Sequence, residues 1–212
     1  MDLAASTGLA TLPELAFADR EHGALTADRI VRVTSDGGRT WSDASVPDLP
    51  AIATEGGHVL RYHLPTFVDK VHGFLAITVT QADAIPVADL VYATSTAGAS
   101  WRLALQDDLQ RHWAFVDERT WIGVGNGQLW TTRDGGSTFE EHSSIGLPMP
   151  LGRAYLTFVD ATHGWGAAVR GNCLPGRFCS IEGPELFATS DGGQTWTRIG
   201  DCIFTCSSPK PS

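Results

Sequence analysis

The sequence lacks several features that mark large classes of protein. Its 212 residues carry 15 Lys and Arg against 24 Asp and Glu, which gives a formal net charge of −9. Affinity for phosphate backbones comes mainly from a basic surface, so this balance argues against a general nucleic-acid binder. No apolar run approaches the length that crosses a bilayer, and Met1 is followed by neither a basic nor an apolar leader segment. We therefore expect no membrane span and no signal peptide in this chain.

Cysteine is absent from the first three quarters of the chain. The four cysteines are Cys173, Cys179, Cys202 and Cys206. Their clustering in a loop-rich region is typical of disulfides in an exported protein. A zinc site is the alternative, but Cys-x5-Cys and Cys-x3-Cys lack the tight Cys-x2-Cys spacing of most structural zinc modules. We predict disulfides, no metal or other cofactor, and a location that is extracytoplasmic, meaning secreted, periplasmic or on the cell surface.

The sequence contains a motif that occurs four times. It reads Thr-x-Asp-Gly-Gly-x-Thr-Trp in its fullest form, and the copies span 34–41, 94–101, 132–139 and 189–196. The second copy has Thr96 in place of the aspartate, and the third ends in phenylalanine. Aspartate can accept hydrogen bonds from turn amides, and glycine supplies the positive φ that tight turns need. The motif therefore predicts a hairpin turn, and its last aromatic residue should anchor that hairpin.

A second motif, Phe-x-Asp-x-x-His-Gly, precedes each copy and is degenerate in the third repeat. Its phenylalanines, Phe17, Phe67, Phe115 and Phe158, are spaced by 50, 48 and 43 residues, a period expected for solenoids, arrays and propeller blades. Each unit contains four short β-rich segments, which predicts an all-β fold of four-stranded antiparallel units. We expect units at about 11–50, 51–106, 107–150 and 151–206, with flexible ends at 1–10 and 207–212.

The fourfold motif resembles the Asp-box (BNR) repeat of sialidase-like β-propellers. The preceding Phe-x-Asp and His-Gly motif makes the chain similar to propellers of the photosystem II assembly and stability factor type, with sortilin-type and xyloglucanase propellers as relatives. This resemblance implies a β-propeller of four-stranded blades, either closed with four blades or part of a larger one. It assigns a structural role to the boxes through these residues: Asp36, Trp41, Trp101, Asp134, Phe139, Asp191 and Trp196.

Strand alternation predicts which loops share a face of the molecule. The Asp boxes and the turns that follow each Phe-x-Asp motif should lie on one face. The opposite face should carry the remaining loops, with insertions at Thr80–Asp89 and Arg170–Pro184 and with all four cysteines. Residues entering the first strand of three repeats should also lie there, and they pair an arginine with an aromatic residue: Arg61 and Tyr62, Arg111 and Trp113, Arg153 and Tyr155.

Arginines beside aromatic residues suit a carboxylate or an acidic peptide, through bidentate hydrogen bonds and stacking. The resemblance likewise implies that a basic patch on the propeller face contacts a protein client. The alternative is that these arginines pair with local carboxylates such as Glu55, Asp107 or Asp108. If the arginines bind ligand, replacing all three by alanine should abolish capture and leave folding nearly intact.

Two other roles have weaker support in the sequence. His22, His72 and His163 occur once per repeat at a turn, so they cannot share one metal ion. The Asp boxes offer one carboxylate each, which falls short of a calcium shell.

A glycoside hydrolase of the sialidase-like exo-glycosidase kind is the enzymatic alternative, but no pair of carboxylates stands out for that chemistry. A purely structural module is a third possibility. The sequence thus favours a non-enzymatic binding or assembly module for a protein, an acidic peptide or a carbohydrate.

Overall fold

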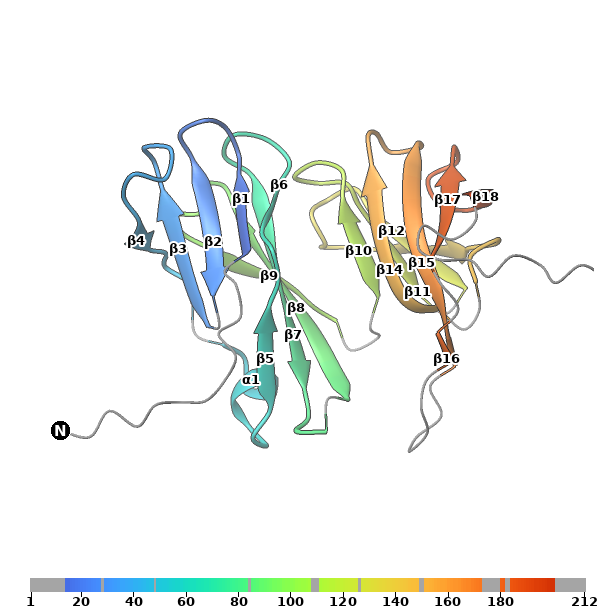
Figure 1. The fold of residues 1–212 in the computed structure, drawn as a ribbon, viewed down its shortest axis with the longest axis horizontal. Helices are drawn as coiled ribbons and strands as arrows, with labels where there is room; N and C mark the ends of the chain where they lie inside the picture. The colour runs from blue at the N-terminus through green and yellow to red at the C-terminus, as the bar shows by residue number, and fades with distance from the viewer. Residues whose placement is uncertain are drawn as a thin grey trace, which may run out of the picture. The chain divides into compact units, whose positions relative to one another are not determined.

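The computed structural model of the chain describes residues 14–27, 29–47, 49–83, 85–107, 111–125, 127–148, 151–172, 180–181 and 184–200 (Figure 1). The four cysteines and the segments 1–10 and 207–212 lie outside these residues. The predicted disulfides and flexible ends therefore stay predictions.

The described chain is almost entirely β and forms four antiparallel sheets, each of which we call a blade. Blade 1 contains β1 (Glu14–Phe17), β2 (Gly23–Ala27), β3 (Ile30–Thr34) and β4 (Ser42–Asp43). Blade 2 follows the short α1 (Ala51–Thr54) and contains β5 (Val59–Tyr62), β6 (Thr66–Phe67), β7 (Gly73–Thr80), β8 (Pro86–Thr94) and β9 (Arg102–Asp107). In this blade β5 and β6 both pair with β7, so together they act as one interrupted first strand.

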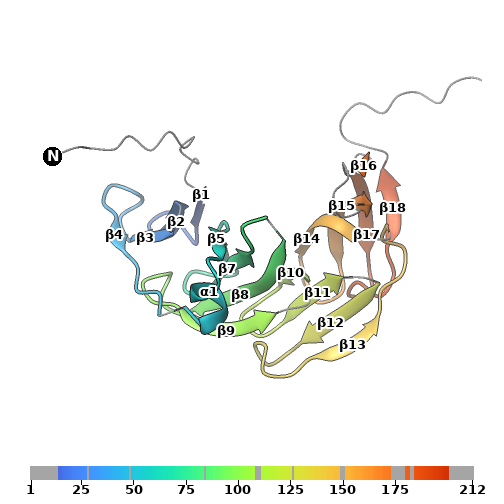
Figure 2. The same cartoon turned by 90° about the horizontal axis from the view of Figure 1, so that it is seen from below.

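The later part of the chain repeats the same order of strands. Blade 3 contains β10 (His112–Phe115), β11 (Trp121–Gly125), β12 (Gln128–Thr132) and β13 (Glu140–Ser143). Blade 4 contains β14 (Leu151–Phe158), β15 (Gly164–Asn172), β16 (Ser180–Ile181), β17 (Glu185–Thr189) and β18 (Thr197–Gly200). Figure 2 shows the strands of each blade side by side in sequence order, as in propeller blades. The predicted all-β fold of four-stranded blades is confirmed.

The chain divides into two compact units, one ending at Gln106 and the other beginning at Asp107. The first unit holds blade 1 and blade 2 up to Gln106, and the second holds Asp107, the last residue of β9, together with blades 3 and 4. Each unit has its own hydrophobic core between its two blades.

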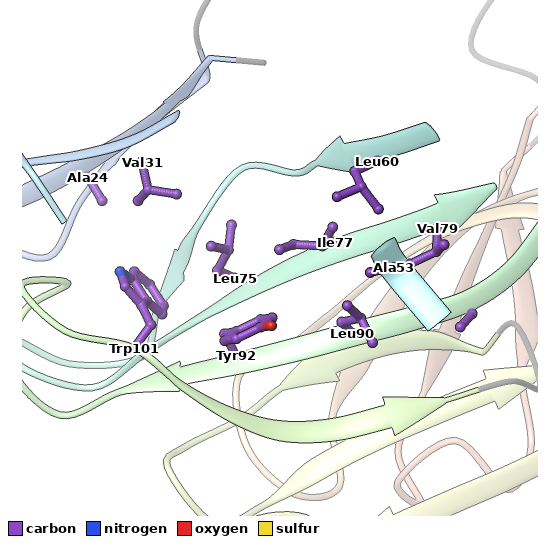
Figure 3. Close-up of a cluster of buried hydrophobic side chains, with 11 residues drawn as sticks. Ala24, Val31, Ala53, Leu60, Leu75, Ile77, Val79, Leu90, Tyr92 and Trp101 are labelled. Atoms are coloured by element: carbon purple, nitrogen blue, oxygen red, sulfur yellow. The ribbon is translucent and has the colours of Figure 1, made fainter. Parts of the chain in front are cut away.

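In the first unit, Ala24 and Val31 of blade 1 pack against the face of blade 2 that carries Leu75, Tyr92 and Trp101 (Figure 3). Figure 3 shows this row of side chains continuing along blade 2 through Ile77, Leu90 and Val79. In the second unit, the core joins Ile122, Val124 and Leu129 of blade 3 to Ala168, Phe187 and Trp196 of blade 4.

The structure differs from the sequence prediction at two places within the blades. The segment Thr80–Asp89 is not one long loop, because β7 and β8 extend through most of it and leave only residues 81–85 between them. Alternate residues of the two paired strands are buried beside this segment, namely Ile77 and Val79 in β7 and Ala88 and Leu90 in β8, and this burial favours strand over loop. We also expected the fourth strand of each blade to begin at the aromatic residue that closes the repeated motif, but it begins one residue later.

Candidate functional site

The four predicted turns join the third and fourth strands of each blade, and we call them TxD turns. In blade 1, the backbone N–H and hydroxyl of Thr40 donate to the Asp36 carboxylate at 2.9 and 2.7 Å. The Thr34 hydroxyl donates to the same carboxylate at 2.8 Å and accepts from the Gly38 amide at 2.9 Å. Blades 3 and 4 repeat these four bonds around Asp134 and Asp191.

These hydrogen bonds lower the pKa values of the aspartates in the turns. The Thr40 amide and hydroxyl hold the pKa of Asp36 at about 2, and Thr138 does the same for Asp134. In blade 2 the Thr96 hydroxyl accepts from the Ser100 amide at 2.9 Å, but it brings no charge. The aspartates are thus used inside the turns and are poorly placed to act on a ligand.

The histidines predicted to be turn residues are bound within their own blades. Asp19 accepts from the His22 amide at 2.8 Å and contacts its ring, and Asp69 makes the equivalent bonds to His72. Within the described residues, no three metal-ligating side chains gather in one place.

A backbone hydrogen bond joins the two turns at the same end of each blade. The Gly37 amide donates to the Glu21 carbonyl at 2.8 Å, and the other blades contain equivalent bonds, which are Ala97 to Val71, Gly135 to Arg119 and Gly192 to Thr162. The other end of each blade therefore carries the loop between the second and third strands and the connection to the next blade. The predicted division of loops between the two ends holds within each blade.

The predicted ligand residues fall in both units. Arg61 is exposed and Tyr62 is half-buried on β5, in the first unit. Arg111, Trp113, Arg153 and Tyr155 belong to the second unit, where Tyr155 is 83% exposed. The side chain of Arg153 lies outside the described part of the structure. The convergence of the three arginines on one ligand thus stays a prediction.

Arg111 has the local partner that the alternative interpretation names. Its Nη1 donates to Asp107 Oδ1 at 2.7 Å, and Trp113 Nε1 donates to Asp107 Oδ2 at 3.1 Å. The Asp107 side chain is 0% exposed and that of Arg111 is 13% exposed. The guanidinium also lies 4.1 Å from the centre of the Trp130 ring. Through these contacts Arg111 fixes the start of β10 against Asp107 and against Trp130 of blade 3.

A second polar cluster lies on blade 2 beside Arg61. His63 Nε2 is 2.8 Å from the Thr78 hydroxyl, which donates to Asp89 Oδ1 at 2.6 Å. Burial lowers the pKa of His63, Arg61 lowers it further, and Glu14 opposes both. Because the threonine hydroxyl points to the carboxylate, it is not activated by the histidine as a nucleophile would be.

The first unit contains an open pocket of about 670 Å³ at the end of blade 1 opposite its TxD turn. The lining residues come from the start of β3, the segment after β4 and β5, and they are Arg29, Ile30, Val31, Arg32, Asp43, Ala44, Val46, Pro47, Leu49, Thr54 and Tyr62. Apolar and polar side chains share the wall about equally, and two arginines and a tyrosine supply hydrogen-bond donors. This pocket is our candidate binding site in the described residues.

The two arginines of the pocket differ in whether they are paired with a carboxylate of the described residues. Arg32 Nε donates to Asp43 Oδ1 at 3.0 Å, so one guanidinium is already paired. Arg29 has no carboxylate partner within the described residues, and its charge acts on Tyr62. Burial raises the pKa of Tyr62 despite this opposing effect of Arg29, so the phenol stays protonated at neutral pH.

Tyr62 was predicted from the sequence, whereas Arg29 and Arg32 were missed. A signal for Arg32 exists in the repeat, because the matching positions of blades 2, 3 and 4 hold Tyr92, Trp130 and Phe187.

Among the described residues, no helix is long and apolar enough to span a membrane.

Comparison with known proteins identifies relatives by structure only. No family model matches the chain, and no curated protein matches it. An α-L-arabinofuranosidase from Fusarium graminearum, solved with an iminosugar inhibitor, is 12% identical with a TM-score of 0.54 over 90% of this chain and 66% of that one. An exo-β-1,3-galactanase from Phanerochaete chrysosporium, solved with β-1,3-galactotriose, is 11% identical with a TM-score of 0.53 over 94% of this chain and 52% of that one.

A structure of YCF48 bound to a D1 peptide also matches, with 16% identity and a TM-score of 0.43 over 89% of this chain and 82% of that one. The chain spans about half the length of the galactanase and about two thirds of the arabinofuranosidase. At such identities the likeness to the two glycosidases establishes the fold, and it assigns no activity. The chain has a β-propeller fold built of four-stranded blades.

Proposed function

We propose that the chain is a non-enzymatic binding module that recognises an acidic, partly apolar peptide segment in the pocket of its first unit. The observation that carries this proposal is Arg29, which lines a partly apolar cavity and has no carboxylate partner among the described residues. Its guanidinium can bind a carboxylate through two parallel hydrogen bonds. The protonated Tyr62 hydroxyl can donate a further bond to the same group.

The composition of the pocket wall favours a peptide over a simple anion. Ile30, Val46, Pro47 and Leu49 offer apolar surface beside the two arginines. A side chain with a carboxylate next to an apolar neighbour would use both kinds of surface. The pocket lies at the end of the blade where we predicted the ligand, and it includes Tyr62 from the predicted set.

Catalysis has less support in this pocket. Most glycoside hydrolases need two carboxyl groups across a cleft, whereas Asp43 is the one carboxylate among the described residues that line this cavity. Asp43 is also bound to Arg32. The raised pKa of Tyr62 makes it a poor nucleophile. A sialidase-like or other glycosidase is therefore our second candidate, and hydrolysis of an aryl arabinofuranoside or galactoside by the purified chain would favour it.

The binding proposal can be tested with a short acetylated and amidated peptide that carries one glutamate between leucines. Its glutamine counterpart serves as the ligand control, and calorimetry measures both affinities. Loss of a hydrogen bond to a charged group costs about 1.5–3 kcal/mol, so Arg29→Ala should weaken binding of the glutamate peptide about ten- to hundred-fold. Tyr62→Phe should weaken it by a smaller factor.

Arg20→Ala is the matched control, because Arg20 is 91% exposed and lies at the opposite end of blade 1. This variant should bind the peptide as the unchanged protein does. Equal affinity for the two peptides, or an Arg29→Ala variant that binds as well as the Arg20→Ala variant, would show that the pocket does not recognise a carboxylate.

We also infer that the TxD turns are Asp boxes and that the protein is extracytoplasmic. The hydrogen bonds of Asp36, Asp134 and Asp191 support the first inference, and the clustering of four cysteines supports the second. Titration of free thiols in the purified chain under denaturing conditions tests the disulfides: four reactive thiols would contradict them.

A further inference from the structure

The two blades of each unit are joined through an interface of the same design. Residues directly opposite each other in an antiparallel pair share a face of the sheet. In blade 3 that face carries Ile122, Val124 and Leu129, each 1% exposed and packed against blade 4. In blade 1 the equivalent face carries Ala24 and Val31, which pack against blade 2. We call this the covered face of a blade.

The covering blade presents its TxD turn to its neighbour. The Trp101 amide donates to the Ser45 carbonyl at 2.9 Å, and the Trp196 amide donates to the Ile145 carbonyl at 2.8 Å. A glycine of the turn lies on the covered face: a Cβ at Gly98 would come within 3.0 Å of Val33, and one at Gly193 within 3.1 Å of Leu129. Backbone bonds and apolar packing thus repeat together in both units.

Blade 4 has a covered-type face that the described residues of its unit do not cover. The pairing of Phe158, Gly164 and Thr189 aligns this blade with blade 3. The positions of Ile122, Val124, Leu129 and Thr131 are then taken by Trp165, Ala167, Leu186 and Ala188. Trp165 is 43% exposed where Ile122 is 1% exposed, and Tyr155, on the same face, is 83% exposed. We call this surface the blade 4 face.

Blade 1 presents the complementary surface. Its residues Leu15, Phe17 and Trp41 match Leu156, Phe158 and Trp196, which belong to the covering side of blade 4. Leu15 is 52% exposed and Phe17 is 41% exposed. Within the described residues, the Trp41 amide has no bridge like that of Trp101 or Trp196. We call Leu15, Phe17 and Trp41 the blade 1 face.

We propose that the blade 4 face of one copy of this chain docks on the blade 1 face of a second copy, head to tail. The contact repeats the interface that already joins the blades of each unit, with the TxD turn of blade 1 lying on Leu186 and Ala188. Arg32 stands where blade 4 has the buried Phe187, so docking brings its guanidinium to Trp165, and this pairing is favourable. Such a heterologous contact produces a ring where the rotation closes and a filament where it does not.

Light scattering coupled to size exclusion tests the assembly on the full chain. The unchanged protein should elute at twice its 22.7 kDa or at a higher multiple. Trp165→Glu and Leu15→Glu should each be monomeric, because each destroys one of the two faces. Val159→Glu is the matched control, since Val159 is 69% exposed on blade 4 in the turn that follows β14, and this variant should assemble normally.

Mixing the two monomeric variants provides the decisive result. The Leu15→Glu copy keeps an intact blade 4 face, and the Trp165→Glu copy keeps an intact blade 1 face. They should form a 1:1 complex, whereas neither associates with itself. A monomeric unchanged protein, or variants that fail to complement although circular dichroism shows them folded, would overturn the proposal. Neither Leu15 nor Trp165 lines the pocket, so this test and the peptide test can fail independently.

Discussion

Replacing Asp107 by alanine should destabilise the second unit by about 3–5 kcal/mol of unfolding free energy, the cost of breaking a buried ion pair from one side. The Asp107 side chain is 0% exposed and accepts from Arg111 Nη1 at 2.7 Å and from Trp113 Nε1 at 3.1 Å. Without it, the charge of Arg111 remains almost buried, since that side chain is 13% exposed, and no other carboxylate among the described residues balances it. The Trp113 indole loses its acceptor as well, and an unsatisfied buried donor costs about 1–3 kcal/mol of this total.

Asp43→Ala is the matched control for this prediction. It breaks a pair of the same chemistry, but the side chains of Arg32 and Asp43 are 50% and 79% exposed. An exposed pair contributes about 0–1 kcal/mol, so this variant should unfold close to the unchanged protein. Urea unfolding followed by tryptophan fluorescence measures both variants, with a separate transition fitted for each unit because the chain need not unfold in two states.

The result that would refute the reasoning is an Asp107→Ala variant that loses no more stability than Asp43→Ala. The paired replacement of Asp107 by leucine and Arg111 by methionine sharpens the test. Removing both charges leaves no uncompensated ion, so this double variant should recover most of the lost stability. We now predict that Arg111→Ala alone destabilises the unit, in contrast to our expectation from the sequence that replacing the three arginines leaves folding nearly intact.

Two further predictions concern the TxD turns. Thr96→Asp should raise the melting temperature at neutral pH. The reason is that the aspartate at this position in the other blades accepts two hydrogen bonds from the residue that matches Ser100. Thr96→Ala should lower the melting temperature, and differential scanning calorimetry measures both variants. Acid should destabilise the unchanged protein: the pKa values of Asp36 and Asp134 are lowered from 3.8 to about 2, so their contribution is complete above pH 3.8 and is lost as the pH falls towards 2. Asp36→Asn should flatten the dependence of melting temperature on pH in that window, and an unchanged slope would show that the turn bonds do not stabilise the fold.

The blades were predictable because their signals are local. Each TxD turn closes through bonds between residues two and four apart, such as Thr34 to Asp36 and Asp36 to Thr40, so eight residues of sequence contain the whole turn. The third strands show alternation and β-branched residues, which select strand there. The turn at the end of β1 follows for the same reason, because Asp19 binds amides two and three residues later.

The candidate site was harder to predict because it depends on contacts between distant segments. The pocket needs the segment after β4 and Tyr62 of blade 2 to lie beside Arg29, and no local pattern sets that arrangement. Arg111 shows the same difficulty. Its partner Asp107 is four residues away and was named as one alternative, but the Trp130 ring over which the guanidinium lies comes from another strand.

The repeat itself separates scaffold from site, because matching positions in the four blades face the same structural demands. The middle of the third strand holds a large aromatic residue in three blades, and two of these, Tyr92 and Phe187, are at most 3% exposed. Blade 1 places Arg32 there, and its side chain is 50% exposed beside the pocket. A charged residue contributes nothing to the packing that selects the aromatic in the other blades, and its pairing with the exposed Asp43 is worth little stability. Its presence is best explained by contact with something outside the blade, and the proposed docking supplies such a contact in Trp165 of a second copy.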